Sequence, residues 1–171
     1  MSFYIAQAIS VLTAAAAIIT MQFKSMKNIL IGQIVINLLA ASTYFLLGGF
    51  SGAGICFIAI AQTITMFFYN VKNKKPHKAV IIGFILLYFA CSAVYYTSPV
   101  DIISALAAIC FALSIVQTNA SGSRIWYSIN PLCWVVYDIY TKAYGNLIMH
   151  LVIFISTAAA IIRNDIMKKN G

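Results

Sequence analysis

Apolar runs of about 20 residues follow one another along the whole chain, and only short polar segments separate them. A run of about 20 apolar residues is what an α-helix needs to cross the hydrocarbon layer of a membrane. The composition agrees, because 63% of the residues are hydrophobic, 8% are charged and the mean hydropathy is +0.94. These values lie outside the range of soluble globular domains. The sequence therefore predicts an integral membrane protein in which residues 1–171 form a single membrane domain.

The polar breaks divide the chain into seven predicted membrane-spanning helices. The longest break is the segment VKNKKPHK at residues 71–78, which separates three predicted helices from four. Pro99 suits the first turn of the fifth helix, where its missing N–H is not needed. The segment TNASGS at residues 118–123 predicts a loop before the sixth helix. The expected helices are Phe3–Met21, Asn28–Leu47, Ser51–Asn70, Ala79–Tyr96, Pro99–Gln117, Ile125–Ala143 and Asn146–Ile162.

The 11 Lys and Arg residues give a net charge of +8, and their distribution predicts the orientation of the chain. Lys142 stands alone on one side of the seven predicted helices, whereas the others occupy the opposite connections. Cytoplasmic loops carry the excess of Lys and Arg, so we expect the N-terminus outside and the C-terminus in the cytoplasm. Their spread over separate loops does not favour a nucleic-acid partner. The other ten are Lys24, Lys27, Lys72, Lys74, Lys75, Lys78, Arg124, Arg163, Lys168 and Lys169.

The two halves of the chain share a weak self-similarity, in which Gln33 falls on Asn130. The first and fifth predicted helices start on the same side, so the halves are expected to be parallel repeats related by an axis along the membrane normal. Chance similarity between apolar helices is the alternative explanation. The predicted fold is an all-α membrane protein with two three-helix repeats and one linker helix (3+1+3). Its parts are residues 1–70, residues 79–96 and residues 99–163.

The segment from residue 124 to residue 163 is apolar enough to cross a membrane twice, yet it holds most of the polar residues that a membrane makes costly. An ionised side chain at the centre of a spanning helix costs roughly 2.5–3.5 kcal/mol on insertion scales, so it normally faces protein or water. The segment is therefore predicted to contain the functional site. Its polar residues are Asn130, Asp138, Lys142, Asn146 and His150.

Five residues are predicted to line a substrate site between the two repeats. Gln33 and Asn130 would hydrogen-bond a solute, Trp134 would pack on it, and Asp138 with His150 would supply charge or a proton. Each also has a purely structural interpretation. Asn130 precedes Pro131, and this pair would then only kink the sixth helix, while His150 would be a hydrogen-bonded packing residue.

Other polar and aromatic residues near this segment favour structural roles. Lys142 lies one helical turn after Asp138 and is expected to anchor the helix at the membrane surface. Trp126, Tyr127 and Tyr144 fit an interfacial aromatic belt.

The sequence contains no signature of a catalytic site. No nucleophile elbow, phosphate-binding loop, metal-ligand spacing or paired carboxylate is present. The four cysteines all fall inside apolar runs and have no CxxC spacing, so they are expected to be buried core residues. We therefore expect neither an enzyme nor a cofactor. The cysteines are Cys56, Cys91, Cys110 and Cys133.

Several stretches of the chain resemble the bacterial inner-membrane proteins of the YgjV type. They are the run from Gln22 to Gly32, the Ser98-Pro99-Val100 start of the fifth helix and the segment CWVVYDIYTKAYGNLIMHLVIFISTAAAIIR. The resemblance covers nearly the whole chain and implies a location in the bacterial inner membrane. It implies no particular activity.

The predicted architecture is more distantly similar to the seven-helix carriers of the SWEET, PQ-loop and PnuC group, whose parallel triplets place a substrate between them. The chain departs from that group because it has no Pro-Gln pair, and Gln33 follows Gly32 where the pair would be expected.

The sequence favours a small-solute transporter or facilitator. The alternative is a non-transporting accessory or structural membrane protein, in which the polar residues only hold helices together. A membrane enzyme that uses Asp138 and His150 is disfavoured because no nucleophile or metal set accompanies them. The expected partners are the lipid bilayer and an unidentified small polar solute, with a second copy of the chain as a further candidate.

Overall fold

The computed structural model describes residues 2–47, 50–96, 99, 101–141 and 144–166, and it is built from helices throughout. No strand occurs in these ranges. A short π-helical turn, η1 (Ile162–Ile166), follows the last α-helix. The seven α-helices are α1 (Ser2–Gln22), α2 (Met26–Leu46), α3 (Phe50–Val71), α4 (Lys78–Val94), α5 (Asp101–Val116), α6 (Ala120–Thr141) and α7 (Tyr144–Ile161). The prediction of an all-α protein with seven helices is confirmed.

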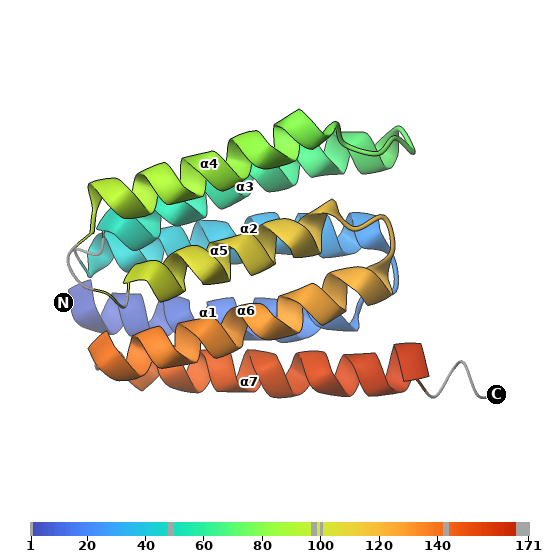
Figure 1. Ribbon diagram of the computed structural model, residues 1–171. Helices are drawn as coiled ribbons and strands as arrows, with labels where there is room; N and C mark the ends of the chain where they lie inside the picture. Colours follow the sequence, from blue (N-terminus) through green and yellow to red (C-terminus); the bar gives the residue numbers. More distant parts are fainter. Residues whose placement is uncertain (1, 48–49, 97–98, 100, 142–143, 167–171) are drawn as a thin grey trace.

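The seven helices lie side by side and alternate in direction, so that their first and last residues fall at the two ends of one bundle (Figure 1). Each helix contacts the next one in sequence, and α7 returns to contact α1. The ring of helices is thereby closed. Two further contacts cross it, between α2 and α6 and between α3 and α5.

These contacts have the pattern that the predicted 3+1+3 repeat requires. Exchanging α1, α2 and α3 with α5, α6 and α7 maps the α1–α2 contact onto α5–α6, and α2–α3 onto α6–α7. The same exchange maps α1–α7 onto α3–α5 and leaves α2–α6 in place. Helix α4 lies outside this pattern and contacts α3 and α5, as a linker would. The repeat itself stays a prediction.

Predicted and observed helices differ most at the start of α6. The sequence predicts a loop over residues 118–123, but α6 begins at Ala120, five residues before the expected Ile125. The Asn119 side chain explains the early start, because its Oδ1 accepts a hydrogen bond of 2.6 Å from the backbone N–H of Gly122. An Asn in this position caps the free N–H groups of the first helical turn. The loop prediction for residues 120–123 is therefore wrong.

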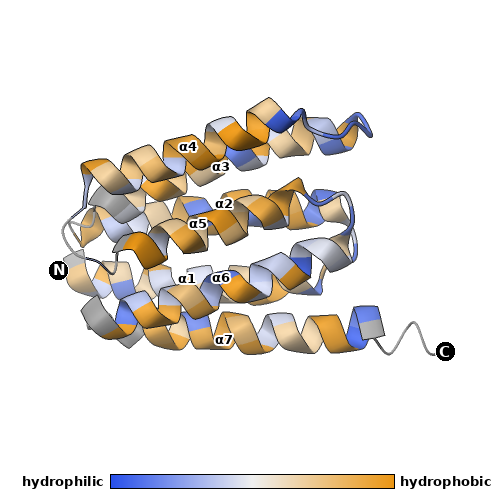
Figure 2. Ribbon diagram, in the orientation of Figure 1, coloured by the Kyte–Doolittle hydropathy of each residue, from blue (hydrophilic) through white to orange (hydrophobic). Residues whose placement is uncertain are grey.

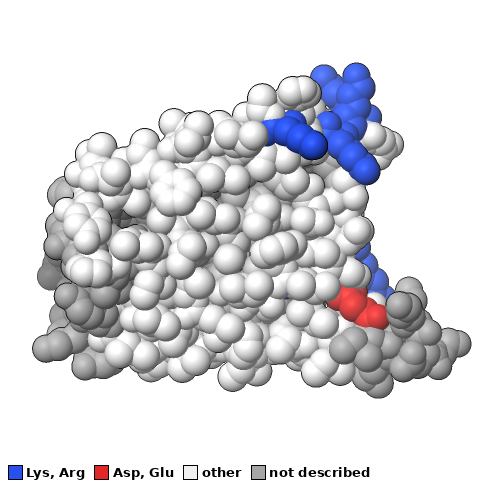
Figure 3. Space-filling view, viewed as in Figure 1, with Lys and Arg blue, Asp and Glu red and all other residues white. Residues whose placement is uncertain are grey.

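The bundle is apolar outside and carries polar residues inside. Large exposed hydrophobic side chains occur on every helix, and fifteen buried residues are polar or charged. Figure 3 shows a broad side surface without charged residues, and in Figure 2 the helices are mostly hydrophobic while the α3–α4 connection is hydrophilic. This is the pattern expected for a bundle surrounded by lipid, whose polar groups must find partners within the protein.

Buried Ser and Thr side chains satisfy much of this internal polarity within their own helices. Most of them donate the hydroxyl to the backbone carbonyl one turn earlier, as Thr63 does to Ala59 at 2.7 Å and Thr157 to Ile153 at 2.8 Å. Such bonds let a hydroxyl stay inside a lipid-surrounded bundle without an interhelical partner. Ser114 of α5 instead donates to the Ser123 carbonyl of α6 at 2.9 Å.

Four helices are long and apolar enough to cross a membrane by length and composition. They are α1, α2, α3 and the segment Leu147–Asp165, which runs from α7 into η1. Helices α4 and α5 are shorter apolar helices of 17 and 16 residues. Helix α6 has 22 residues but a more polar composition.

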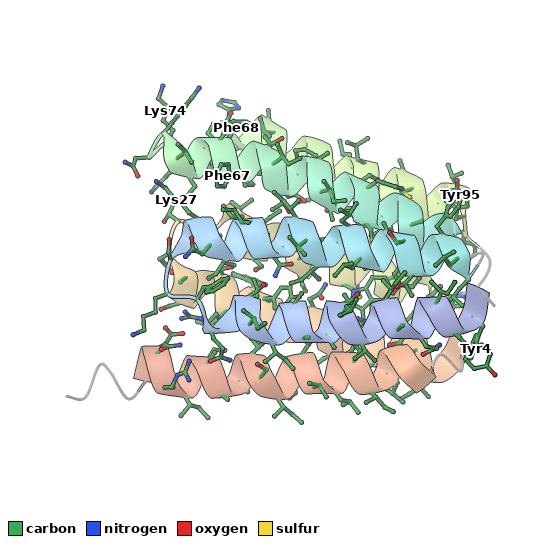
Figure 4. The ribbon with its side chains drawn as sticks, turned by 180° about the vertical axis from the view of Figure 1, so that it is seen from behind. Tyr4, Lys27, Phe67, Phe68, Lys74 and Tyr95 are labelled. Carbon is green, nitrogen blue, oxygen red and sulfur yellow. The ribbon has the colours of Figure 1, made fainter. Side chains whose placement is uncertain are left out.

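The described Lys and Arg residues gather at one end of the bundle. In Figure 4 Lys27 and Lys74 lie at this end, whereas Tyr4 and Tyr95 lie at the opposite end. The connections α1–α2, α3–α4 and α5–α6 all meet there (Figure 1). We call it the basic end. Lys142, predicted for the other end, lies outside the described residues.

A close approach between α1 and α2 depends on Gly32. A Cβ atom added at Gly32 would lie 2.8 Å from the Cβ of Thr20 and closer still to its Oγ1 and Cγ2. Thr20 cannot turn away freely, because its hydroxyl donates a hydrogen bond of 2.7 Å to the Ala16 carbonyl. Glycine is therefore required for these two helices to pack at their present separation.

Candidate functional site

Helix α6 has two distinct faces, and its polar residues lie on the inner one. Its exposed apolar residues recur at helical spacing and form a face toward the surroundings. They are Ile125, Ile129, Leu132, Val136 and Ile139. The opposite face is buried and carries Arg124, Tyr127, Asn130 and Asp138. The low apolar content of α6 thus results from side chains that face the other helices.

A cavity of about 70 Å³, counted as the space open to the centre of a water molecule, lies inside the bundle next to this buried face. A single water needs roughly 10–15 Å³ by this measure, so the cavity has room for several waters or a small molecule. Its wall includes residues from all seven helices, among them Thr13 of α1, Tyr88 of α4 and Ala108 of α5. Asn130 lies at the eleventh position of α6, roughly 15 Å from the start of the helix at a rise of 1.5 Å per residue. The cavity is therefore close to the middle of the bundle.

Amide side chains from two helices face this cavity. Asn130 is 8% exposed and donates its amide nitrogen to the Ala107 carbonyl of α5 at 2.8 Å. Asn37 of α2 donates its amide nitrogen to the Gln33 carbonyl at 2.7 Å. Gln33 is 1% exposed, and its amide nitrogen makes no hydrogen bond of normal geometry, although the Tyr127 hydroxyl is near enough to interact with it. Pro131 has no N–H to donate to the Tyr127 carbonyl, yet α6 continues through it.

A buried His–Asp pair lies on one side of the cavity. His150 Nδ1 is 2.7 Å from Asp138 Oδ2, and the two residues are 7% and 1% exposed. The Trp134 ring stacks on the His150 ring with centroids 5.8 Å apart and planes 10° from parallel. Tyr44 of α2 stacks on Trp134 at 6.3 Å, and Tyr137 meets Trp134 edge-on at 5.6 Å. The Asp138 carboxylate therefore holds the imidazole by its Nδ1 while the Trp134 ring covers one face of it.

The structure brings together all five residues that the sequence predicts for the site. Gln33, Asn130, Trp134 and His150 line the cavity. Asp138 is not part of the cavity wall and contacts the wall residue His150. Whether these residues bind a substrate stays a prediction.

Tyr127 is a cavity residue that sequence reasoning missed. It was expected in an interfacial aromatic belt, but it is 4% exposed, lines the cavity and packs edge-on against Phe111 at 6.5 Å. The belt prediction is therefore wrong for Tyr127. Its place three residues before Asn130, on the same helical face, was the available signal.

A second buried polar cluster, also missed, lies at the basic end. Arg124 was expected to be a loop charge, but it lies inside α6 and is 2% exposed. Its guanidinium donates to the carbonyls of Met21 at 3.3 Å and Phe23 at 2.6 Å, and it pairs with Asp165 Oδ1 at 2.8 Å. The same carboxylate oxygen accepts a hydrogen bond of 2.6 Å from Ser121. Arg124 therefore joins the end of α1 to α6 and to η1, and we call this set the Arg124 cluster.

A neighbouring polar contact reinforces the basic end. Gln22 donates to the Ser156 carbonyl of α7 and accepts from Arg163. This contact adds polar links to the packing of α1 against α7 that closes the ring of helices.

The described residues contain no group of three or more His, Cys, Asp and Glu side chains that could hold a metal ion. The four cysteines are free thiols, of which Cys56 is buried and the others are partly buried. The prediction of buried core residues is confirmed for Cys56 and wrong for Cys91, Cys110 and Cys133, which are partly exposed on α4, α5 and α6.

Replacing Asp138 tests the His–Asp pair. Asp138→Leu leaves the buried His150 Nδ1 without this acceptor and should lower the free energy of unfolding by about 2 kcal/mol. Asp138→Asn keeps an oxygen that can accept from Nδ1, so we expect less than half of that loss. Thermal unfolding in detergent measures both variants. Equal losses would contradict a hydrogen bond to Nδ1 as the main contribution.

The fold and the interior of the bundle define a multi-helix membrane protein with an apolar outer surface and an internal cavity whose mostly apolar wall carries a few polar groups. A family model described as bacterial inner membrane protein, Imp-YgjV, matches residues 4–168, and the chain belongs to this family. No curated protein and no solved structure matches the chain. The resemblance to the YgjV type is thereby confirmed, and a location in the bacterial inner membrane follows from it.

Proposed function

We propose that the protein is a transporter or facilitator for a small polar solute, and that the cavity between the two helix triplets is its binding site. The observation that carries the proposal is a central cavity whose wall combines amide groups from α2 and α6 with a buried His–Asp pair. Buried polar groups in a membrane bundle are costly unless they have partners or contact water or a ligand. Gln33, with an unsatisfied amide nitrogen at 1% exposure, is the clearest case.

The proposal includes seven membrane crossings and a defined orientation. The four helices that are apolar enough to span a membrane lie alongside the other three in one bundle, which supports seven crossings (Figure 1). The basic end would then face the cytoplasm by the positive-inside rule, with the N-terminus outside. A solute would reach the cavity from either side by rocking of one triplet against the other.

Cysteine accessibility at position 130 tests the proposal without a known solute. In a background that lacks the four native cysteines, Asn130→Cys is expected to react with membrane-impermeant thiol reagents from both sides of the membrane. A carrier that alternates would expose the cavity to each side in turn. The measurement is the labelled fraction in right-side-out and inside-out vesicles.

Two control positions calibrate the labelling. Leu132→Cys, on the apolar outer face of α6, should resist labelling from both sides. Its side chain is 43% exposed in the bundle, but this exposed face would meet lipid and not water. Lys74→Cys, in the α3–α4 connection, should label only from the cytoplasmic side. If position 130 behaved like position 132, the carrier proposal would fail and the accessory or structural role would take its place.

A further inference from the structure

The polar atoms that line the cavity restrict the kind of solute it can hold. Two amide oxygens, of Asn37 and Asn130, have no hydrogen-bond partner among the described residues, while each amide nitrogen is bound to a backbone carbonyl. A carbonyl oxygen only accepts hydrogen bonds, so the group that faces it must be the NH₂. The orientation of both amides is thereby fixed, and both present an oxygen as the remaining polar atom. The cavity thus offers two acceptors from opposite triplets.

Gln33 adds a donor to these acceptors. Its amide nitrogen is buried, makes no hydrogen bond of normal geometry and belongs to a residue of the cavity wall. A buried donor without a partner costs roughly 1–3 kcal/mol, a cost that a bound solute or a trapped water relieves. A matching solute therefore carries at least two N–H or O–H donors and at least one acceptor.

The cavity wall also restricts the charge of the solute. The wall contains no Lys, Arg, Asp or Glu among its described residues. Its ionisable groups are His150, already paired with Asp138 of α6, together with Tyr44, Cys56, Tyr88 and Tyr127. An ion transferred into such surroundings would lose its hydration and meet no free opposite charge.

We infer that the cavity takes a small uncharged solute with an amide-like set of neighbouring donors and acceptor, and that it excludes ions of similar size. The inference rests on the proposed function, because it assigns the ligand class of the same cavity. The apolar share of the wall agrees with it, since rings such as Phe111 and Tyr88 surround the few polar atoms. A small neutral molecule with one polar edge fits that arrangement.

Three probes of nearly equal shape and different charge test this inference. They are acetamide, which is neutral, acetamidinium, which is its cationic counterpart, and acetate, which is an anion without donors. The chain has two tryptophans, so Trp126→Phe leaves Trp134 of the cavity wall as the only tryptophan reporter. In detergent, acetamide should change the Trp134 emission saturably at millimolar concentration. Acetate and acetamidinium should give only the linear decrease of collisional quenching.

Substitutions of the anchored amides supply the matched controls. Asn130→Leu and Asn37→Leu each remove one acceptor and should weaken acetamide binding about five- to tenfold. Asn28→Leu makes the same change at an exposed position of α2 outside the cavity wall and should leave binding unchanged. Asn130→Asp keeps the shape and adds a negative charge, so it should create a saturable response to acetamidinium.

The outcomes separate the ligand class from the carrier function. A saturable response to acetate or acetamidinium in the parent protein, or none to acetamide, would overturn the inference. Binding is measured in solubilised protein and needs no transport, whereas the labelling of position 130 reports access across the membrane. An open cavity that ignores acetamide would leave the carrier proposal standing and refute only the ligand class.

Discussion

Arg124→Met should lower the free energy of unfolding by about 3–5 kcal/mol, the range expected when one partner of a buried ion pair is removed. Three acceptors lose their donor at once. The carbonyls of Met21 and Phe23 at the end of α1 would have no side-chain partner, and Asp165 would lose its ion pair. The measurement is unfolding of the purified protein in mixed micelles of increasing SDS content, followed by circular dichroism.

A second arginine of the basic end provides the control. Arg163 is exposed and donates to the Gln22 side chain, so Arg163→Met should cost less than about 1 kcal/mol. Arg124→Lys should fall between the two, because an ammonium group cannot reach three acceptors with the fixed fork of a guanidinium. If both Met variants had the same stability, the Arg124 cluster would not hold the helices together.

Gly32→Ala should cost about 3 kcal/mol, because the added methyl group would overlap the Thr20 side chain and force α1 away from α2. The two helices would separate along the line where they pack most closely, next to the α2 segment that holds Gln33. Thermal unfolding in detergent measures the loss. Gly83→Ala in α4 is the matched control, since nothing lies within 4 Å of a Cβ there, and it should be neutral or slightly stabilising.

The double variant Thr20→Gly with Gly32→Ala identifies the cause. Thr20→Gly removes all three atoms that the new methyl group would meet. The loss of unfolding free energy in the double variant should therefore be smaller than the sum of the two single losses by at least about 1 kcal/mol. Additive losses would show that Gly32 is needed for another reason.

Seven helices and most of their limits could be predicted from hydropathy alone. The expected first helix, Phe3–Met21, differs by one residue at each end from the observed Ser2–Gln22. Lipid-spanning segments are predictable because their backbone must be satisfied within the helix, which leaves long apolar runs and abrupt polar breaks. The start of α6 could not be predicted in this way. Ser121 is polar because it bonds to Asp165 and Ser123 because it bonds to Ser114, and not because they form a loop.

The site was predictable to the extent that its residues share one helix. Asn130, Trp134 and Asp138 recur at four-residue spacing, so their common face follows from helix geometry. His150 was placed near Asp138 by counting residues from the turn between two antiparallel helices, and the structure has them in contact.

Arg124 and Asp165 are 41 residues apart and pair only after α7 has returned along α6. Single-sequence reasoning treats Arg124 as a loop charge, because nothing near it in sequence shows a partner. The amide nitrogen of Gln33 is a similar case, since its lack of a hydrogen bond of normal geometry is a property of the packed bundle.

The Arg124 cluster also constrains the order in which the protein is made. Ribosomes deliver α6 to the membrane before η1 exists, so Arg124 enters without the carboxylate that neutralises it. Until synthesis passes residue 165, the carbonyls of Met21 and Phe23 would be the acceptors left to the Arg124 guanidinium, and its charge would be unpaired within the cluster. Maturation of the bundle would then depend on the last turn of the chain, and a nascent chain stalled before Asp165 should be a preferred substrate for membrane quality-control proteases.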